Sequence, residues 1–396
     1  MSMTGRERIA AVLGGGSPDR LPVEVGATEF TGVTAIAYGP LKAGLGVEGG
    51  HTRVADPFRN TVRVERAFHE KLGVDAVGLF AEPLRWRAAN LPDGSNCLLP
   101  ERWQTEIAPE GAEVFRHPVS DTVLTRSAAE ERFIYAEPPL GACETPDDVA
   151  KALQAVAFFD WPHHADEIAS QFGVRAAARR AETQSACVLN VRARLMGGLL
   201  ELRGARALAD LEENPALVDA ILDRLADTYI ARLTDILPEV GPHADVVCVA
   251  EGPGEGIGVE AYRGHFKRRY ERILSHIRTT CSLPVVVFVT GMAPELVREI
   301  AGLGVDGVGL GCADTGPSAA DVRAACGPDV AIWGAGCATD ILARGTPDEA
   351  RDEVKRAVEA AGGPGRLVFA FGEPLGPGTA PANLVAALDA AREMKV

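Results

Sequence analysis

The sequence predicts an α/β protein folded as a (β/α)8 TIM barrel with an irregular insertion after the second strand. Three observations support this fold class. Eight short apolar runs are spaced along the chain, and a segment with helical spacing follows most of them. Residues 283–316 form a strand–helix–strand unit with short turns, the crossover that a parallel sheet requires. Between residues 83 and 182 this alternation breaks down, which indicates the insertion.

The expected elements follow from the spacing of apolar residues along the chain. Strands are expected in the continuous apolar runs, at residues 21–25, 74–80, 186–191, 244–250, 283–289, 305–310, 330–334 and 367–371. Helices are expected where apolar residues recur every three or four positions, at residues 4–13, 59–72, 215–237, 262–278, 294–303, 347–361 and 381–394. The glycine-rich residues 26–50 predict a long loop with one helical turn near 35–41. We expect residues 1–396 to form a single barrel domain, with the insertion at about 84–182.

Composition and charge exclude several classes of protein. A hydrophobic content of 46% and a charged content of 24% are typical of a soluble globular protein. The formal net charge of −15 argues against binding to a nucleic-acid backbone. No apolar run approaches the roughly 18 residues of a membrane span, and the opening residues do not predict a signal peptide. We therefore expect a cytoplasmic protein without nucleic-acid or membrane partners.

In a barrel of this kind, the residues that follow the strands converge on one cavity. Polar or charged residues occupy many of these positions, namely Glu24, Glu29, Glu82, Asn190, Arg192, Arg194, Glu251, Glu255, Thr290, Cys312, Asp314, Cys337, Asp340 and Glu373. Carboxylates that share a low-dielectric mouth raise one another's pKa and can supply a general acid or base. Arg192 and Arg194, two positions apart, can bind a carboxylate. An internal arginine–glutamate network is the alternative interpretation.

The histidines and cysteines do not show the spacing of a metal site. None of the histidines directly follows a predicted strand, and the cysteines contain no CxxC pair. A mixed set of Cys312 or Cys337 with Glu251 or Glu373 is the remaining zinc arrangement, and no spacing supports it. The segment EGPGEGIG lacks the Lys-Ser/Thr of a phosphate-binding loop and predicts a flexible catalytic loop or a turn.

Several segments, in order, resemble the uroporphyrinogen decarboxylase superfamily. They are TGRERIAAVLGGGSPDRLPVEVG at the start, LGVDAVGLF, ELRGARALADLEENPALV, LPVVVFVTG with LGVDGVGL, GPDVAIWGAG, and FGEPLGPGTAPANLVAAL near the end. The resemblance implies a (β/α)8 fold. It also implies either a cofactor-free decarboxylase or a zinc-dependent methyltransferase that works with a corrinoid protein. The segment GATEFTGVTAIAYGPLK resembles the uncharacterised, methyltransferase-like branch.

The chain departs from both branches at their functional positions. The decarboxylases carry an arginine-rich turn after the first strand, where this chain has Gly26 to Phe30. The thiol-activating methyltransferases carry His-x-Cys after the fifth strand, where Phe288 and Thr290 stand here. Their third ligand follows the last strand, and Glu373 takes its place. The resemblance therefore implies no zinc by the usual route of the family, and we expect no metal ligands.

The leading hypothesis is methyl transfer between a small methylated substrate and a corrinoid protein. Glu251, Glu373 and Arg192 are expected to be catalytic, and the expected substrate-binding residues are Glu29, Glu82, Asn190, Arg194, Thr290 and Cys312. We expect no tightly bound cofactor, with the corrinoid supplied by a partner protein. The alternatives are a cofactor-independent decarboxylase acting on a smaller carboxylic acid and a non-catalytic, partner-binding barrel. A helix-covered exterior also permits a homodimer.

Overall fold

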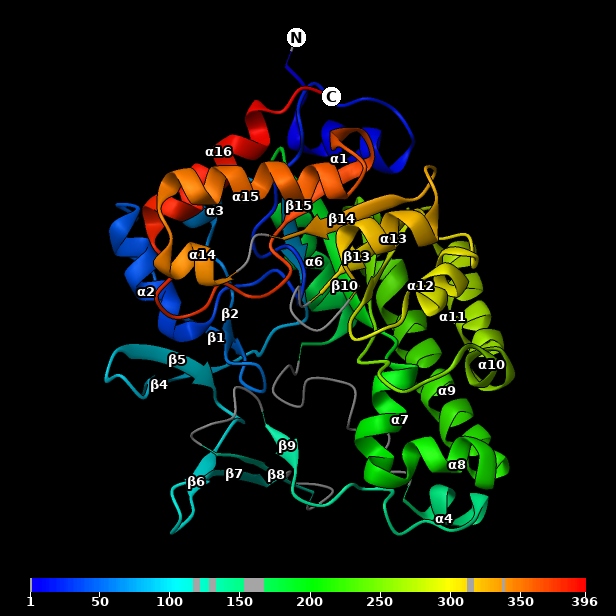
Figure 1. Cartoon of the computed structure of the whole chain (residues 1–396). Coiled ribbons are helices and arrows are strands. Elements are labelled where there is room, and N and C mark those ends of the chain that lie inside the picture. Colours follow the sequence, from blue (N-terminus) through cyan, green and yellow to red (C-terminus); the bar gives the residue numbers. More distant parts are fainter. Residues whose placement is uncertain (1, 117–121, 128–132, 153–166, 312–316, 337–338) are drawn as a thin grey trace.

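A parallel sheet organises the fold (Figure 1). The computed structural model describes residues 2–116, 122–127, 133–152, 167–311, 317–336 and 339–396. Its largest sheet has seven parallel strands in the order β15-β14-β13-β12-β11-β10-β3. The strands are β3 (Ala76–Leu79), β10 (Ala186–Arg192), β11 (Val246–Ala250), β12 (Val285–Val289), β13 (Gly307–Leu310), β14 (Ala331–Ala335) and β15 (Leu367–Ala370). Each of the last seven apolar runs thus forms a strand, as predicted.

The first apolar run connects the two edges of this sheet. Val23 forms a parallel bridge with Phe369 of β15, and Glu24 forms one with Ala76 of β3. The amide N–H of Glu24 donates to the carbonyl of Phe369 over 2.9 Å, and that of Asp75 donates to Val23 over 2.8 Å. The sheet therefore curls into a TIM-barrel-like arrangement. Residues 21–25, predicted as a strand, contribute single bridges rather than a regular strand.

Helices surround the sheet (Figure 1). They are α1 (Gly5–Leu13), α2 (Ala35–Gly44), α3 (Arg66–Leu72), α4 (Pro146–Lys151), α6 (Ala169–Ala181), α7 (Leu195–Arg203), α8 (Ala207–Glu213), α9 (Pro215–Val240), α10 (Val259–Ala261), α11 (Lys267–Thr280), α12 (Pro294–Ala301), α13 (Ala319–Cys326), α14 (Thr339–Arg344), α15 (Pro347–Ala360) and α16 (Pro381–Glu393). A short π-helix, Tyr262–Phe266, leads into α11. Within the described part of the chain, none of the helices is both long and apolar enough to cross a membrane.

Side chains along each strand point alternately to the two faces of the sheet, so the sheet separates two hydrophobic clusters. The inner cluster lies inside the curled sheet and takes every second strand residue, including Ala186, Val188, Val246, Cys248, Val286, Phe288, Ala331, Trp333, Val368 and Ala370. The residues between them pack against the helices in a larger, outer cluster. Ile9, Val12 and Leu13 of α1 complete the inner cluster, so α1 closes the amino-terminal end of the barrel.

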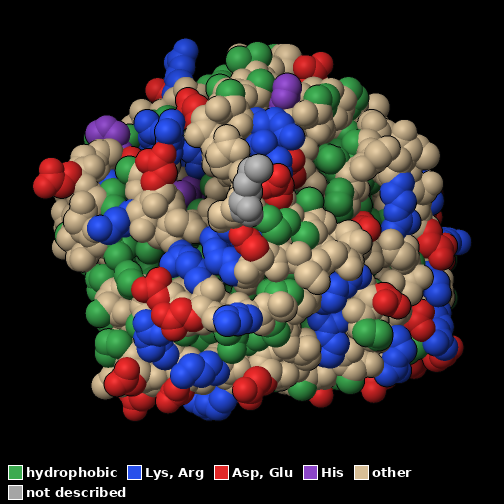
Figure 2. Space-filling view, turned by 90° about the horizontal axis from the view of Figure 1, so that it is seen from above, with side chains coloured by type: hydrophobic (Ala, Val, Ile, Leu, Met, Phe, Trp, Pro, Cys, Tyr) green, Lys and Arg blue, Asp and Glu red, His purple; other side chains and the backbone are tan. Residues whose placement is uncertain are grey.

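Ion pairs attach α1 to the sheet. Arg8 contacts Asp19 over 2.6 Å and Asp75 over 2.9 Å, and Arg20 contacts Asp75 over 2.7 Å. Viewed from the α1 side, lysine and arginine side chains alternate with aspartate and glutamate across the surface (Figure 2). Both chain ends lie at this end of the molecule, away from the carboxyl ends of the strands (Figure 1).

The segment after β3 forms two small antiparallel sheets below the barrel in the view of Figure 1. A hairpin pairs β4 (Trp86–Asn90) with β5 (Asn96–Pro100), and a four-stranded sheet contains β6 (Thr105–Ile107), β7 (Glu113–Arg116), β8 (Val123–Arg126) and β9 (Ile134–Tyr135). Trp103, Phe115, Leu124 and Phe133 give the four-stranded sheet its own buried cluster. The described part of the chain in which the alternation breaks down thus contains these two small sheets, followed by the helices α4 and α6.

Two helices near the amino terminus have other bounds than the sequence predicted. Residues 35–41 were expected to form one helical turn, but α2 extends over ten residues because Ala37, Tyr38 and Leu41 are buried. The helix expected at 59–72 begins only at Arg66. Before it, β2 (Thr61–Val62) pairs with β1 (Val54–Asp56), and tertiary pairing overrides the helical spacing.

Candidate active site

A large cavity lies at the carboxyl ends of the barrel strands. Its volume is about 1580 Å³, more than the usual few hundred Å³ of a small-molecule pocket. Residues after the strands form its inner wall, including Arg194, Gly252, Pro253, Glu255, Thr290, Gly291, Gly372 and Glu373. The small sheets form the opposite wall through Leu99, Trp103, Ile107, Glu113, Arg126 and Ile134. The cavity therefore lies between the barrel and the segment that follows β3.

Stacked aromatic rings form part of the cavity floor. Phe30 lines the cavity and stacks on the buried Phe288 of β12, with ring centroids 5.2 Å apart and planes at 6°. The guanidinium of Arg59 lies 5.3 Å from the Phe30 ring centroid. Because Phe288 belongs to the inner cluster, the stack separates the apolar barrel interior from the polar cavity above it. Sequence reasoning missed Arg59 and Phe30 as site residues, and no strand-end signal marks them.

Arg192 belongs to a charge network beside this floor. It follows Ala186, Val188 and Asn190 in the inward-facing alternation of β10, so strand geometry turns it toward the barrel mouth. Its Nε donates to both carboxylate oxygens of Glu29, over 3.0 and 3.2 Å, and its Nη2 donates to Asp56 over 3.2 Å. Glu29 also receives a 3.0 Å hydrogen bond from Arg59. Burial opposes ionisation of Glu29, but the charges of Arg192 and Arg59 hold its pKa below the usual value.

Asn190 lies one layer deeper in the barrel. Its amide nitrogen donates to the carbonyl groups of Ala27, over 2.9 Å, and Val188, over 3.1 Å. Its buried Oδ1 has no partner among the residues that the structure describes. Asn190 is absent from the lining of the large cavity as described, so it supports the floor.

The inner wall is held together by Arg194. Its Nε and Nη2 donate to the carbonyl oxygen of Gly252, over 3.1 and 3.0 Å, and it forms an ion pair with Glu201. Thr290 also lines the cavity, and its hydroxyl lies 3.4 Å from the carbonyl oxygen of Glu251. The structure thus brings together Glu29, Arg194, Thr290 and Glu373 from the predicted set around one cavity.

Glu251 is oriented away from that cavity. Val246, Cys248 and Ala250 have the inward parity of β11, so the next residue turns outward to the helices. Its fully buried carboxylate accepts hydrogen bonds from the N–H groups of Leu195 (2.8 Å), Gly197 (3.2 Å) and Gly252 (2.6 Å). Burial raises the pKa of Glu251 to about 7, opposed by the backbone N–H groups that stabilise the ionised form. This position supports a structural role at the start of α7 rather than contact with substrate.

Glu82 belongs to a second network that does not line the described cavity. Its carboxylate contacts Arg63 over 2.8 Å and Arg175 over 3.4 Å, and its backbone N–H donates to Glu167. Burial opposes ionisation, but these arginine charges lower the pKa of Glu82 overall. Glu82 therefore connects β3 to the helical layer.

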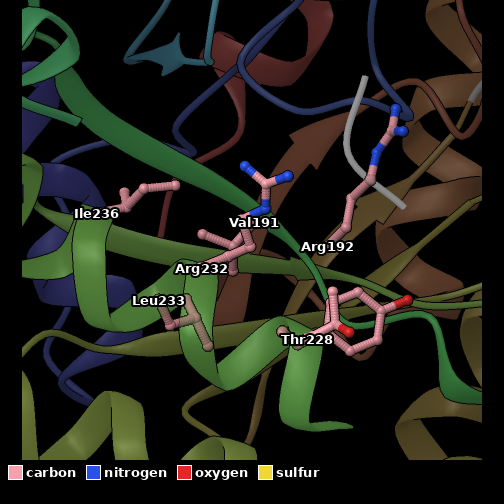
Figure 3. Close-up of a pocket in the computed structure, with 7 residues that line it drawn as sticks. Val191, Arg192, Thr228, Arg232, Leu233 and Ile236 are labelled. Carbon is pink, nitrogen blue, oxygen red and sulfur yellow. The ribbon is translucent and has the colours of Figure 1, made fainter. Parts of the chain in front are cut away.

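A small second cavity separates β10 from α9 (Figure 3). Its volume is about 20 Å³, enough for about one water molecule. Val191 and Arg192 contribute from β10, and Thr228, Arg232, Leu233 and Ile236 contribute from α9. This size is consistent with a packing gap behind the Arg192 network.

Phe288 stands at one of the positions at which the family resemblance places zinc ligands. Phe288 has no ligand atom, and its ring stacks with Phe30. The part of the chain that the structure describes contains no group of three or more His, Cys, Asp or Glu residues suited to a metal. Cys312 and Cys337 lie outside the described residues. The expectations for zinc and for Cys312 as a substrate contact remain predictions.

Comparisons with known proteins agree with this architecture. The family model described as Uroporphyrinogen decarboxylase (URO-D) matches residues 189–394. A uroporphyrinogen decarboxylase from Chromohalobacter salexigens is 30% identical over 203 residues, covering 50% of this chain and 54% of that protein. The one from Methylococcus capsulatus is 27% identical over 199 residues, covering 50% and 54%. These matches span about half the length of the curated relatives.

A solved structure shares the fold over nearly the full length. The methyltransferase from Methanosarcina mazei superposes with a TM-score of 0.58, at 17% identity, covering 99% of both chains. An identity this low supports the common fold alone. The family model, by contrast, matches more than half of this sequence, from residue 189 to residue 394. The chain therefore belongs to the uroporphyrinogen decarboxylase family.

Proposed function

We propose that this protein is an enzyme that transfers a methyl group between a small methylated substrate and a corrinoid carried by a partner protein. The cavity of about 1580 Å³ has room for a small substrate together with part of a larger co-substrate. The fold shared with the Methanosarcina mazei methyltransferase is compatible with this reaction. The corrinoid is a co-substrate in this proposal, and none of the steps below depends on a resident cofactor.

The charge balance of the cavity is the observation that carries the proposal. Each of the four arginines in its described lining lies within 3.9 Å of a carboxylate, in the pairs Arg59–Glu29, Arg126–Glu113, Arg194–Glu201 and Arg344–Asp340. Glu255 and Glu373 add two further carboxylates to the lining. A substrate with many carboxylates requires guanidinium groups that are available to it. This cavity therefore favours a neutral or weakly charged substrate over a polycarboxylate.

The cavity carboxylates supply the acid–base chemistry in this proposal. When a methyl group leaves an oxygen, nitrogen or sulfur atom, the atom that remains takes up a proton. Glu373 and Glu255 lie on the cavity wall and are placed to donate that proton or to accept it in the reverse direction. Arg192 acts through Glu29, whose orientation it fixes, and Glu251 acts by holding the start of α7.

A direct assay tests this function. The purified protein is incubated with cob(I)alamin and a panel of methylated oxygen, nitrogen and sulfur compounds, and formation of methylcob(III)alamin is followed by its absorption spectrum. We expect turnover with at least one neutral or weakly charged compound. The proposal fails if the folded protein, with the corrinoid supplied either free or on a carrier protein, forms no methylcobalamin from any compound in a broad panel.

Decarboxylation of a smaller carboxylic acid is the second candidate. The family match and the uroporphyrinogen decarboxylases among the relatives favour it. In this reaction an arginine binds one carboxylate, and a buried acid protonates the carbanion left after CO2 departs. Release of CO2 from a small acid in the absence of any corrinoid would support this function over methyl transfer.

A further inference from the structure

Glu29 occupies a position between two arginine side chains at the cavity floor. One guanidinium, that of Arg192, donates to its carboxylate over 3.0 and 3.2 Å, and the other, that of Arg59, donates over 3.0 Å. The Glu29 side chain is 14% exposed and lines the cavity. Two guanidinium groups around one carboxylate are the arrangement with which proteins recognise a carboxylate ligand.

Contacts other than those with Glu29 hold both arginines in place. Arg59 lies over the Phe30 ring at 5.3 Å, and the Nη2 of Arg192 donates to Asp56 over 3.2 Å. Asp56 is itself fixed by the backbone N–H groups of Phe58 and Arg59, over 3.0 and 3.2 Å. The two guanidinium groups therefore keep anchors on the protein when the carboxylate between them is removed.

Glu29 is one of two carboxylates among the described residues that pair with these two guanidinium groups. Arg59 and Arg192 contribute two positive charges, and Glu29 and Asp56 contribute two negative charges. Removing Glu29 takes one negative charge away from a partly buried site that faces the cavity. One monocarboxylate from solution would supply that charge again.

We infer that Glu29 is a specificity-determining residue: it is an internal carboxylate that fills a two-arginine anion site and so excludes anionic groups of a substrate from the cavity floor. Replacement of Glu29 by a small residue converts this position into a binding site for a small carboxylate. The inference rests on the proposed function only in taking this cavity as the active site.

The test compares acetate binding by wild type and Glu29→Ala, with inorganic chloride at equal ionic strength as the reference. We expect E29A to unfold at a lower temperature than wild type. Acetate at about 50 mM should raise its unfolding midpoint by at least about 2 °C more than chloride does, because a ligand bound to the folded state stabilises it. Calorimetric titration should show one acetate site per chain in E29A. Wild type should show no such site, because Glu29 occupies it.

Two further variants control for non-specific effects. Glu113→Ala removes a carboxylate from the same cavity, but Glu113 pairs with the single arginine Arg126, so acetate should have no specific effect on it. The double variant E29A with Arg192→Leu should lose acetate binding. Should E29A not fold alone, Glu29→Ser and refolding of E29A in acetate against chloride test the same site, and acetate should increase the refolding yield.

The inference is overturned if folded E29A or E29S responds to acetate no more than to chloride, or if acetate gives no advantage in refolding. It is also overturned if wild type binds acetate as tightly as E29A does. These measurements detect binding and stability without turnover. Failure here would therefore leave the methyl-transfer proposal standing, and failure of the turnover assay would leave the anion site standing.

Discussion

The hydroxyl group of Tyr270 in α11 donates a hydrogen bond to the carboxylate of Glu251, and neither side chain is more than 2% exposed. The same carboxylate accepts N–H groups from the first turn of α7 and from Gly252. One carboxylate thus joins the end of β11 to two helices of the outer layer. This junction holds the loop whose Gly252 and Glu255 line the cavity.

The first prediction concerns the stability of this junction. Glu251→Gln should lower the free energy of unfolding by about 2–4 kcal/mol, because the amide NH2 would face backbone N–H donors inside the protein. Tyr270→Phe should cost about 1 kcal/mol. Tyr262→Phe is a matched control, since the buried Tyr262 hydroxyl has no partner among the described residues, and it should cost almost nothing. Denaturant titration checks all three, and an effect of Y262F as large as that of Y270F would contradict the assignment.

The second prediction concerns pH. Glu24 is fully buried, and burial raises its pKa from 4.5 to about 7, against hydrogen bonds from Thr31 and Ala27 that favour the ionised form. The folded state therefore holds a proton that the unfolded chain releases between about pH 4.5 and 7. The stability contributed by this group is complete below pH 4.5 and is lost as pH rises through 7.

Glu24→Gln removes this dependence while keeping a neutral acceptor. Near pH 5 this group should cause little difference between the free energies of unfolding of the variant and of wild type. At pH 8 the variant should gain up to about 3 kcal/mol relative to wild type, because wild type must hold a buried charge. Measuring the free energy of unfolding of both proteins from pH 5 to 8 checks this. A difference that stays constant with pH, or that changes in the opposite direction, would show that Glu24 does not titrate as described.

The third prediction concerns the backbone conformation of Gly252 at the cavity wall. Gly252 has a φ of +108°, and a Cβ at this position would overlap Oγ1 of Thr290. Gly252→Ala should therefore lower the free energy of unfolding by about 1–3 kcal/mol. It should also displace the carbonyl oxygen that Arg194 contacts. Gly258 lies on the same segment and has an ordinary φ of −80°. A Cβ added there would meet no atom within 4 Å apart from its chain neighbours, so Gly258→Ala should be nearly neutral. Thermal unfolding of the two variants compares them, and equal midpoints would contradict the prediction.

The fourth prediction concerns a buried ion pair between α7 and α8. Arg203 and Asp210 are both fully buried 2.5 Å apart, and Arg203 also donates to the carbonyl groups of Leu140 and Gly141. Arg203→Ala should cost about 3–5 kcal/mol, because it leaves the Asp210 charge buried. Arg66→Ala, which breaks an exposed pair with Glu70, should cost no more than about 0.5 kcal/mol. Urea titration of both variants provides the comparison, in which similar losses would count against the burial argument.

The fifth prediction distinguishes the roles of Glu373 and Glu255 by the effect of their substitution on kcat. In whichever reaction the turnover assay detects, Glu373→Gln should lower kcat by about 10²–10⁴-fold if Glu373 is the proton donor. The unfolding midpoint should change little, because the residue lies at the cavity wall. Glu255→Gln is the matched comparison, because Glu255 lines the same cavity and follows β11 rather than β15. An unchanged kcat in E373Q together with a large loss in E255Q would transfer the role to Glu255.

The sequence by itself determined the framework of this protein. Continuous apolar runs mark buried parallel strands, so seven of the eight predicted runs appear as strands within two residues of their expected ends. The helices α9, α11, α12, α15 and α16 follow the spacing of their buried residues. These strands and helices depend on local composition or on the spacing of apolar residues, and both can be read from a single sequence.

Tertiary structure alone decided which strand-end residues meet. Arg59 reaches Glu29 because a turn and a two-stranded pairing replace the expected helix, and no spacing in the sequence links the two. Glu251 and Glu82 look equivalent to Glu373 in a list of strand-end residues, yet only Glu373 among these three lines the described cavity. The direction of a side chain at the end of a strand depends on parity, strand register and the helix that follows. Those are fixed by packing across the whole barrel, and the sequence of one strand does not contain them.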